Sequence, residues 1–201
     1  ILQQCLTMAA DAGFNRISID GDTSTNDACM LLASGRAGVE IHEPHGEAFV
    51  VFNQAVKDVL AELAQAIVRD AEGATKFLTL DTGQGASEPD CLEVAYTIAH
   101  SPLVKTAFFA SDPNWGRILA AIGRARIAHL NTDTVSIYLD EVCVVRAGGR
   151  APEYTEAQGV AVMRQSEIRL RVLLGSGSAS ARLWTCDLSH DYVRINAEYR
   201  S

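Results

Sequence analysis

Side chains that could do chemistry are densest at residues 20–27, whose sequence is DGDTSTND. Their carboxylate, hydroxyl and amide groups can hydrogen-bond a ligand or the backbone, and the glycine frees the turn. Residues 14–19 alternate like a half-buried strand, and residues 28–33 predict a buried helix. A strand that opens into a polar turn and a helix leaves helix N–H groups facing a crevice. The segment is therefore either a ligand-binding turn or a well-capped turn, with one of residues 25–27 as the N-cap.

Two other polar clusters lack the spacing that chemistry requires. Residues 189–191 are Ser, His and Asp, but adjacent residues cannot face one another as nucleophile, base and orienting group of a hydrolase triad. Residues 40–45 hold two histidines and two glutamates, but no third ligand at helical spacing. We therefore expect neither a triad nor a metal site.

Four motifs follow one another along the chain. They are FNRI at residues 14–17 with DGDTSTND at 20–27, EGATK at 72–76, SDPNWGR at 111–117, and the tail at 187–201. In this order they resemble the ornithine acetyltransferase family, also called glutamate N-acetyltransferase. Members of that family are made as one precursor that cuts itself before a threonine, which then heads the β chain as its nucleophile. The chain resembles this β chain without its first stretch.

The resemblance implies roles for three residues. Glu72 takes a substrate-binding position, where a carboxylate could hold an amino group of ornithine through a charge-assisted hydrogen bond. Asn196 and Ser201 take two C-terminal substrate-binding positions, where amide and hydroxyl groups suit a carboxylate or an amide oxygen. No residue present is assigned as catalytic, because Ile1 is not a threonine and the nucleophile is expected upstream of it. From periodicity alone, Glu72 is a solvated glutamate in the last turn of a helix, where it opposes the helix dipole.

The implied reaction moves acetyl from N2-acetylornithine to glutamate in arginine biosynthesis, through an acetyl-threonine intermediate. No cofactor is expected, although acetyl-CoA could serve as an acetyl donor. An α chain from the same precursor would supply oxyanion donors and a lysine, in an α2β2 heterotetramer. Two alternatives stay open: a related self-processing amide hydrolase or aminopeptidase, in which water takes the acyl group, and a non-catalytic scaffold subunit.

Apolar patterns predict a mixed α/β fold, with sheets layered with helices as the resemblance also implies. Helices are expected at residues 1–12 and 48–71, the second from a long apolar stripe. We place a boundary between residues 1–74, as part of a main layered domain shared with the α chain, and residues 75–201, as a smaller C-terminal α+β domain with a substrate-binding tail. Strands are predicted at residues 75–80, 103–110, 135–139, 142–146, 167–174 and 179–186.

Local signals predict where several helices begin. Ser87 with Asp90 and Thr155 with Gln158 resemble capping boxes. Asp112 precedes a proline and predicts a further N-cap.

Composition excludes several classes of protein. The chain has 201 residues, of which 48% are hydrophobic, and a net charge of −8, which disfavours a nucleic-acid partner. No apolar run approaches the ~20 residues that span a bilayer, and no secretory signal is visible. Five widely spaced cysteines argue against a disulfide framework. Those at 29, 143 and 186 are expected in the core, and the cytoplasm is the expected compartment.

Overall fold

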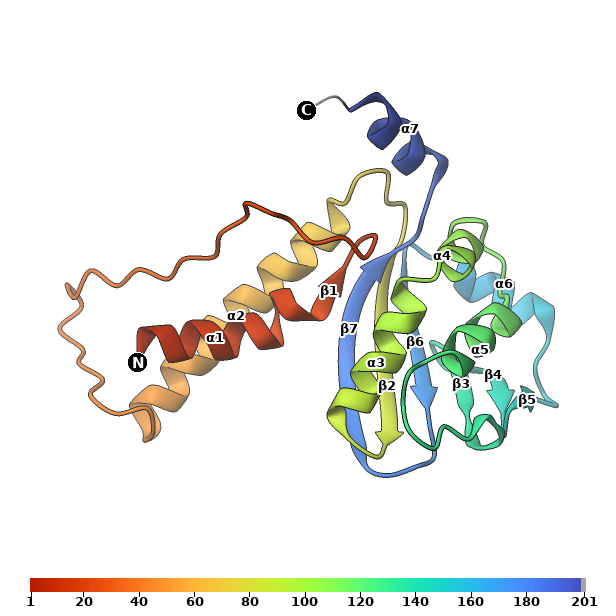
Figure 1. Cartoon of the computed structure of the whole chain (residues 1–201), viewed down its shortest axis with the longest axis horizontal. Helices are drawn as coiled ribbons and strands as arrows, with labels where there is room; N and C mark the ends of the chain where they lie inside the picture. The colour runs from red at the N-terminus through yellow and green to blue at the C-terminus, as the bar shows by residue number, and fades with distance from the viewer. Residues whose placement is uncertain (200–201) are drawn as a thin grey trace. The chain divides into compact units, whose positions relative to one another are not determined.

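The computed structural model describes residues 1–199 (Figure 1). Its internal contacts divide the chain into two compact units. One unit comprises Ile1–Ile17 and Asp22–Ile67, and the other comprises Ser18–Gly21 and Val68–Ser201. The domain boundary near residue 75 stays a prediction.

The first unit is built on two helices, α1 (Leu2–Ala12) and most of α2 (Glu47–Arg69). Ala9 of α1 forms a small buried cluster with Val56 and Leu60 of α2. Gly13 follows α1, and a Cβ there would lie 2.9 Å from the carbonyl oxygen of Leu60, so only glycine allows this close approach. The two helices predicted at residues 1–12 and 48–71 are confirmed.

Between these helices the chain has less regular structure than the sequence predicts. Residues 14–16 form a 3-10 helix, so the strand predicted from residue 14 is limited to β1. The buried helix predicted at 28–33 is wrong, because these residues form neither helix nor strand and most of them are exposed. Cys29 is exposed rather than in the core. A six-residue apolar run is too short to form a stable helix unless tertiary packing supports it.

The second unit contains a seven-stranded sheet with the order β1-β7-β2-β6-β3-β4-β5 among the described residues. Strand β2 pairs in parallel with β6 and antiparallel with β7, while β3 pairs antiparallel with β6 and β4. The predicted mixed α/β class is confirmed. The strands are β1 (Ile17–Ser18), β2 (Phe77–Gly85), β3 (Ser136–Leu139), β4 (Val142–Arg146), β5 (Gly149–Arg150), β6 (Glu167–Leu173) and β7 (Ala179–Cys186).

Helices cover one face of this sheet (Figure 1). Alternate strand residues such as Leu80, Leu170 and Leu183 form a buried core with helix residues such as Ile98 and Phe108. The other face carries charged pairs. The helices of this unit are α3 (Glu88–Ala99), α4 (Pro102–Phe109), α5 (Trp115–Gly123), α6 (Glu156–Met163) and α7 (His190–Glu198).

Charged pairs on the other face of the sheet centre on one carboxylate. Asp81 accepts hydrogen bonds from Arg169 and Arg182. Partial burial raises the pKa of Asp81, but the two guanidinium groups outweigh it and lower the pKa below its usual value. This face therefore carries paired charges beside buried apolar side chains such as Phe77 and Trp184.

The strand predicted at residues 103–110 is wrong, because this segment is helix α4. Its start carries two signals that outweigh its apolar composition. The Ser101 side chain caps the helix by accepting from the Val104 N–H, and Pro102 stands in the first turn. Val104 and Phe108, one turn apart, are both buried, as a helix face requires.

The other predicted helix starts have mixed outcomes. The Ser87 side chain accepts from the Asp90 N–H, and the capping box at Thr155 is present, so both predictions are confirmed. The N-cap predicted at Asp112 is wrong. Asn114 caps α5 instead, and Asp112 accepts a hydrogen bond from the Asn114 amide.

No helix within residues 1–199 is both long enough and apolar enough to cross a membrane.

Candidate functional site

Glu72 lies in the turn between α2 and β2, beyond the last helical residue Arg69. The sequence predicted that Glu72 lies in the last helical turn, and this prediction is wrong. The next residue, Gly73, has a φ of +67°. A Cβ at Gly73 would lie 2.5 Å from the backbone nitrogen of Tyr192 and 2.8 Å from Ser189 Oγ. Only glycine lets the turn and the start of α7 meet this closely.

Asn196, on α7, contacts Glu72 directly. Its Nδ2 donates to Glu72 Oε2 at 2.9 Å and to the Tyr192 carbonyl oxygen at 3.0 Å. The structure thus brings together two of the three predicted binding residues, although 124 positions separate them. Ser201 lies outside the described residues.

Helix α7 is held by polar contacts, since none of its residues is buried. Ser189 caps it by accepting from the Tyr192 N–H at 3.2 Å, and the same hydroxyl donates to the Gly73 carbonyl oxygen at 2.6 Å. The Tyr192 hydroxyl donates to Asp20 Oδ2 at 2.8 Å. Asp20 opens the polar segment 20–27, so one residue of that segment meets the helix that carries Asn196.

The chain around Asp20 is positioned by His100 at the end of α3. The imidazole lies 3.4 Å from where a Cβ of Gly21 would be, and its Nε2 is 2.8 Å from Ser18 Oγ. Burial, and then the charge of Lys105, lower the pKa of His100, although Asp20 opposes them. His100 is therefore neutral at pH 7 and serves the structural role expected of a residue that fixes a turn.

The remainder of the polar segment belongs to the first unit. Ser24 Oγ accepts from the N–H groups of Asn26 and Asp27, at 3.4 and 3.3 Å. These bonds close a local turn, but no helix follows it. Residues 25–27 are thus not helix N-caps.

Asp187 was missed by sequence reasoning, although a polar residue directly after a predicted strand could have indicated it. Its buried carboxylate accepts from the N–H groups of Thr75 and Lys76, at 2.8 and 2.9 Å, and from the Thr75 hydroxyl at 2.5 Å. The Lys76 ammonium donates to the Met163 carbonyl oxygen at 2.7 Å. Asp187 therefore fixes the chain only three residues beyond Glu72.

Lys105 was also missed, and its signal was a single charge within the apolar sequence of α4. Its Nζ is buried and donates to the Thr185 hydroxyl at 3.1 Å and to the Cys186 carbonyl oxygen. Burial lowers the pKa of Lys105, while Cys186 and Asp187 oppose this. Thr185 in turn donates to the Ser18 carbonyl oxygen at 2.6 Å, which ties β1 to the end of β7.

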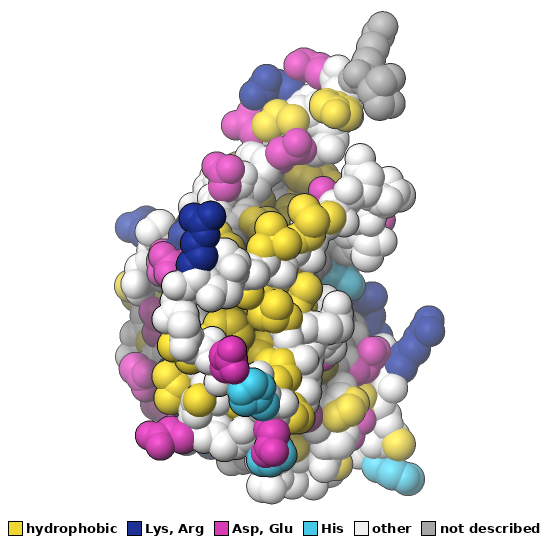
Figure 2. All heavy atoms as spheres, turned by 90° about the vertical axis from the view of Figure 1, so that its left-hand side faces the viewer, with side chains coloured by type: hydrophobic (Ala, Val, Ile, Leu, Met, Phe, Trp, Pro, Cys, Tyr) yellow, Lys and Arg dark blue, Asp and Glu magenta, His cyan; other side chains and the backbone are white. Residues whose placement is uncertain are grey.

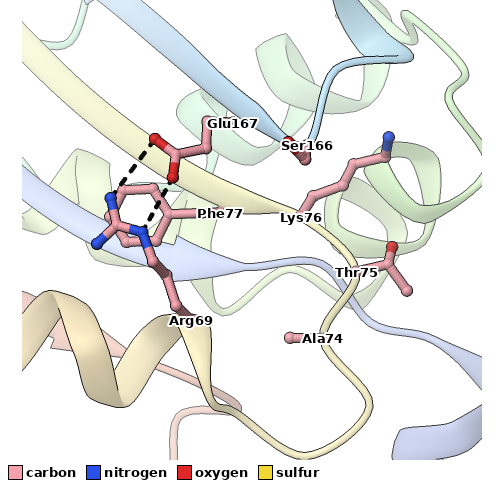
Figure 3. A pocket seen from close by; sticks show the side chains of 7 residues that line it. All are labelled: Arg69, Ala74, Thr75, Lys76, Phe77, Ser166 and Glu167. Carbon is pink, nitrogen blue, oxygen red and sulfur yellow. Dashed lines mark hydrogen bonds and ion pairs between the residues drawn. The ribbon is translucent and has the colours of Figure 1, made fainter.

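A cavity of about 180 Å³ lies beside the same turn (Figure 3). Arg69 closes one side of it by pairing with Glu167, with Nε 3.0 Å from Oε1, and its guanidinium lies 3.8 Å from the centre of the Phe77 ring. Neither Glu72 nor Asn196 lines this cavity. Its lining residues are Arg69, Ala74, Thr75, Lys76, Phe77, Ser166 and Glu167.

The candidate site is therefore the exposed cluster around Glu72 and Asn196. It offers the Glu72 carboxylate for an ammonium group and the Asn196 amide for a carboxylate or an amide oxygen, and Asp20 is joined to the same helix through the Tyr192 hydroxyl. Within residues 1–199, no group of three or more His, Cys, Asp or Glu side chains could hold a metal ion. Such a set of groups can bind a small zwitterion or an acylated amino acid.

Comparison with known proteins gives this chemistry a context. Proteins named arginine biosynthesis bifunctional protein ArgJ are similar along the whole chain, with 60% identity in Methylococcus capsulatus and 56% in Pseudomonas fluorescens. The chain spans about half the length of these curated relatives, 49% and 50% respectively.

A solved structure has the same fold. The crystal structure of arginine biosynthesis bifunctional protein ArgJ from Bacillus halodurans superposes with a TM-score of 0.92 and 36% sequence identity, over 98% of this chain and 92% of that chain. The profile of the ArgJ family matches residues 1–201. Because that match spans the whole sequence and the fold agrees, the chain belongs to the ArgJ family.

Proposed function

We propose that the chain is the β subunit of an acetyltransferase that moves acetyl from N2-acetylornithine to glutamate in arginine biosynthesis. Glu72 binds the substrate ammonium group, and Asn196 binds its carboxylate or amide oxygen. Ser201 completes the pocket from the C-terminal tail of a domain formed by residues 75–201. Acetyl-CoA is a second donor, no cofactor is required, and the enzyme works in the cytoplasm.

The observation that carries this proposal is the hydrogen bond between Asn196 and Glu72. The bond joins α7 to the α2–β2 turn and places an acceptor of ammonium beside a donor to carboxylate. These are the complementary groups that an amino acid requires. Membership of the ArgJ family supports the choice of an amino-acid substrate.

The nucleophile in this proposal is a threonine that precedes Ile1 in the full-length protein. Its hydroxyl attacks the acetyl carbonyl of N2-acetylornithine while its own amine takes the hydroxyl proton. The amine then gives that proton to the departing nitrogen, so that ornithine leaves and an acetyl-threonine remains. Glutamate then takes the acetyl group. An α chain from the same precursor supplies oxyanion donors, and the assembly is α2β2. The length of the solved relative supports two chains, because this chain, half as long as curated relatives, covers 92% of that one.

The experiment is to incubate the full-length protein with N2-acetylornithine, with and without glutamate, and to measure ornithine and N-acetylglutamate. Transfer requires that N-acetylglutamate forms in step with ornithine. Equal ornithine release without glutamate, together with free acetate, would instead identify an amide hydrolase. Absence of turnover in an intact assembly would favour a scaffold subunit.

A further inference from the structure

Helix α2 carries an exposed apolar row beside its buried stripe. Val51, Val59, Leu63 and Ile67 are 48–64% exposed, and Ala55 between them is exposed as well. We call these five residues the outer ridge; they follow one another at intervals of four. Rows at this interval are the ridges by which helices pack into grooves of a partner. Figure 2 shows apolar side chains gathered on one face of the molecule.

The first unit has little core of its own to stabilise this helix. Its buried apolar residues among the described ones are few and mostly small: Cys5, Ala9, Phe49, Val56, Leu60 and Ala64. The apolar face of this 23-residue helix is wider than the part that is buried, as is typical of a helix that packs against a further surface. The outer ridge therefore has the pattern of an interface rather than of a solvated face.

The flank of the ridge restricts the partner. Asp58 and Glu62 are exposed beside it, and Asp58 accepts from Gln54 Nε2 at 2.7 Å. A second copy of this chain would bring an identical acidic edge to a twofold contact, and like charges placed together are costly. The chain's net charge of −8 adds to that repulsion. The ridge fits an apolar surface that has basic residues along one edge.

The curated relatives contain about as much sequence again as this chain. We propose that the outer ridge of α2 docks on that other half of the full-length protein, on an apolar surface with a basic edge. The inference rests on the proposed function only in taking the partner to be the α chain. It adds the surface by which the two chains hold together.

The test uses the two halves of the full-length protein, co-expressed as separate polypeptides with a tag on this chain. The double variant Val59→Lys, Leu63→Lys places two cations on the ridge. We expect at least a tenfold loss of affinity between the halves, measured by co-elution and by titration. The matched control is Leu103→Lys, because Leu103 is 61% exposed but lies on α4, and it should leave the complex intact.

Circular dichroism of the isolated chain checks that each variant keeps its helices, since the substituted side chains are exposed. A complex of wild-type affinity in the double variant overturns the proposal, as does equal loss in Leu103→Lys. Neither the affinity between the halves nor the circular dichroism depends on catalytic activity. A stable but inactive wild-type complex would therefore refute the proposed function without contradicting the docking surface.

A second measurement identifies what covers the ridge. Val59→Cys in a Cys29→Ser background has one exposed thiol, because the other four cysteines are buried. We expect rapid maleimide labelling in the isolated chain and protection in the complex. Protection in the isolated chain at all concentrations would mean that the chain covers its own ridge. Protection that grows with concentration would mean self-association, and either result contradicts the proposal.

Discussion

At the scale of single residues, the candidate site depends on a carboxylate and an amide that satisfy each other. Glu72 is exposed and stands in a turn rather than in a helix, so its removal leaves no buried group unpaired. Replacing Glu72 should therefore weaken ligand binding and leave the free energy of unfolding nearly unchanged.

Glu72→Ala should raise KM for ornithine substrates roughly 10- to 100-fold. A lost charge-assisted hydrogen bond is worth about 1.5–3 kcal/mol. The melting temperature should move little. Steady-state kinetics and thermal unfolding of the full assembly check this, and a large fall in melting temperature with unchanged KM would show Glu72 to be structural.

Tyr192→Phe removes only the hydroxyl that Asp20 accepts. Because α7 has no buried residue, we expect the variant to loosen α7 and to raise KM, with less effect on kcat. Hydrogen exchange of residues 190–198 should increase. Asp20→Asn should be milder than Asp20→Ala, because an amide oxygen can still accept from the phenol. Exchange and KM equal to those of the wild type would contradict this positioning role.

The lowered pKa of His100 should make the free energy of unfolding depend on pH. Its pKa is lowered in the folded protein, mainly by burial, so below about pH 6.5 the unfolded chain binds protons that the folded one resists. The free energy of unfolding should therefore fall as pH drops from about 6.5. His100→Gln should weaken this dependence between pH 6.5 and 5 in urea titrations. Superimposable pH curves for the two proteins would count against it.

At the scale of elements, the end of β7 anchors the turn that carries Glu72. The buried Asp187 carboxylate satisfies two N–H groups and one hydroxyl of residues 75–76.

Asp187→Ala should lower the free energy of unfolding by about 2–5 kcal/mol, because several buried donors lose their acceptor. Asp191→Ala is the matched control, since Asp191 is an exposed carboxylate nearby that pairs with Arg194. The control should change stability by less than about 1 kcal/mol. Equal effects of the two substitutions in urea unfolding would refute the anchoring role.

The helices and strands also show which sequence signals are sufficient to predict an element. Long amphipathic α2 and the alternating strands β6 and β7 are predictable, because their periodicity extends over many residues. Helix α4 resembled a strand because its segment is short and mostly apolar, interrupted only by Lys105 and Thr106, and its start was marked only by Ser101 and Pro102. Residues 28–33 are apolar enough for a helix but have little to pack against, which the sequence does not reveal.

At the scale of the whole molecule, the site depends on contacts between distant parts of the second unit. Family motifs indicated Glu72 and Asn196 separately, but only the fold shows that α7 brings them within 2.9 Å. Asp187 and Lys105 were not predicted, because their roles arise from burial and from backbone groups far away in sequence. Periodicity and motifs carry no information about such contacts.

The contact between Glu72 and Asn196 has a consequence for selectivity. Their hydrogen bond occupies one oxygen of the Glu72 carboxylate and one N–H of the Asn196 amide, so a ligand carboxylate that takes this N–H must break the bond, whereas an ammonium group could bind the carboxylate beside it. A molecule with only a carboxylate would take the Asn196 N–H and leave Glu72 to water. A molecule with both ends at the correct separation restores both interactions. The pair would thus favour a ligand that carries both an ammonium group and a carboxylate over an acid that carries a carboxylate alone.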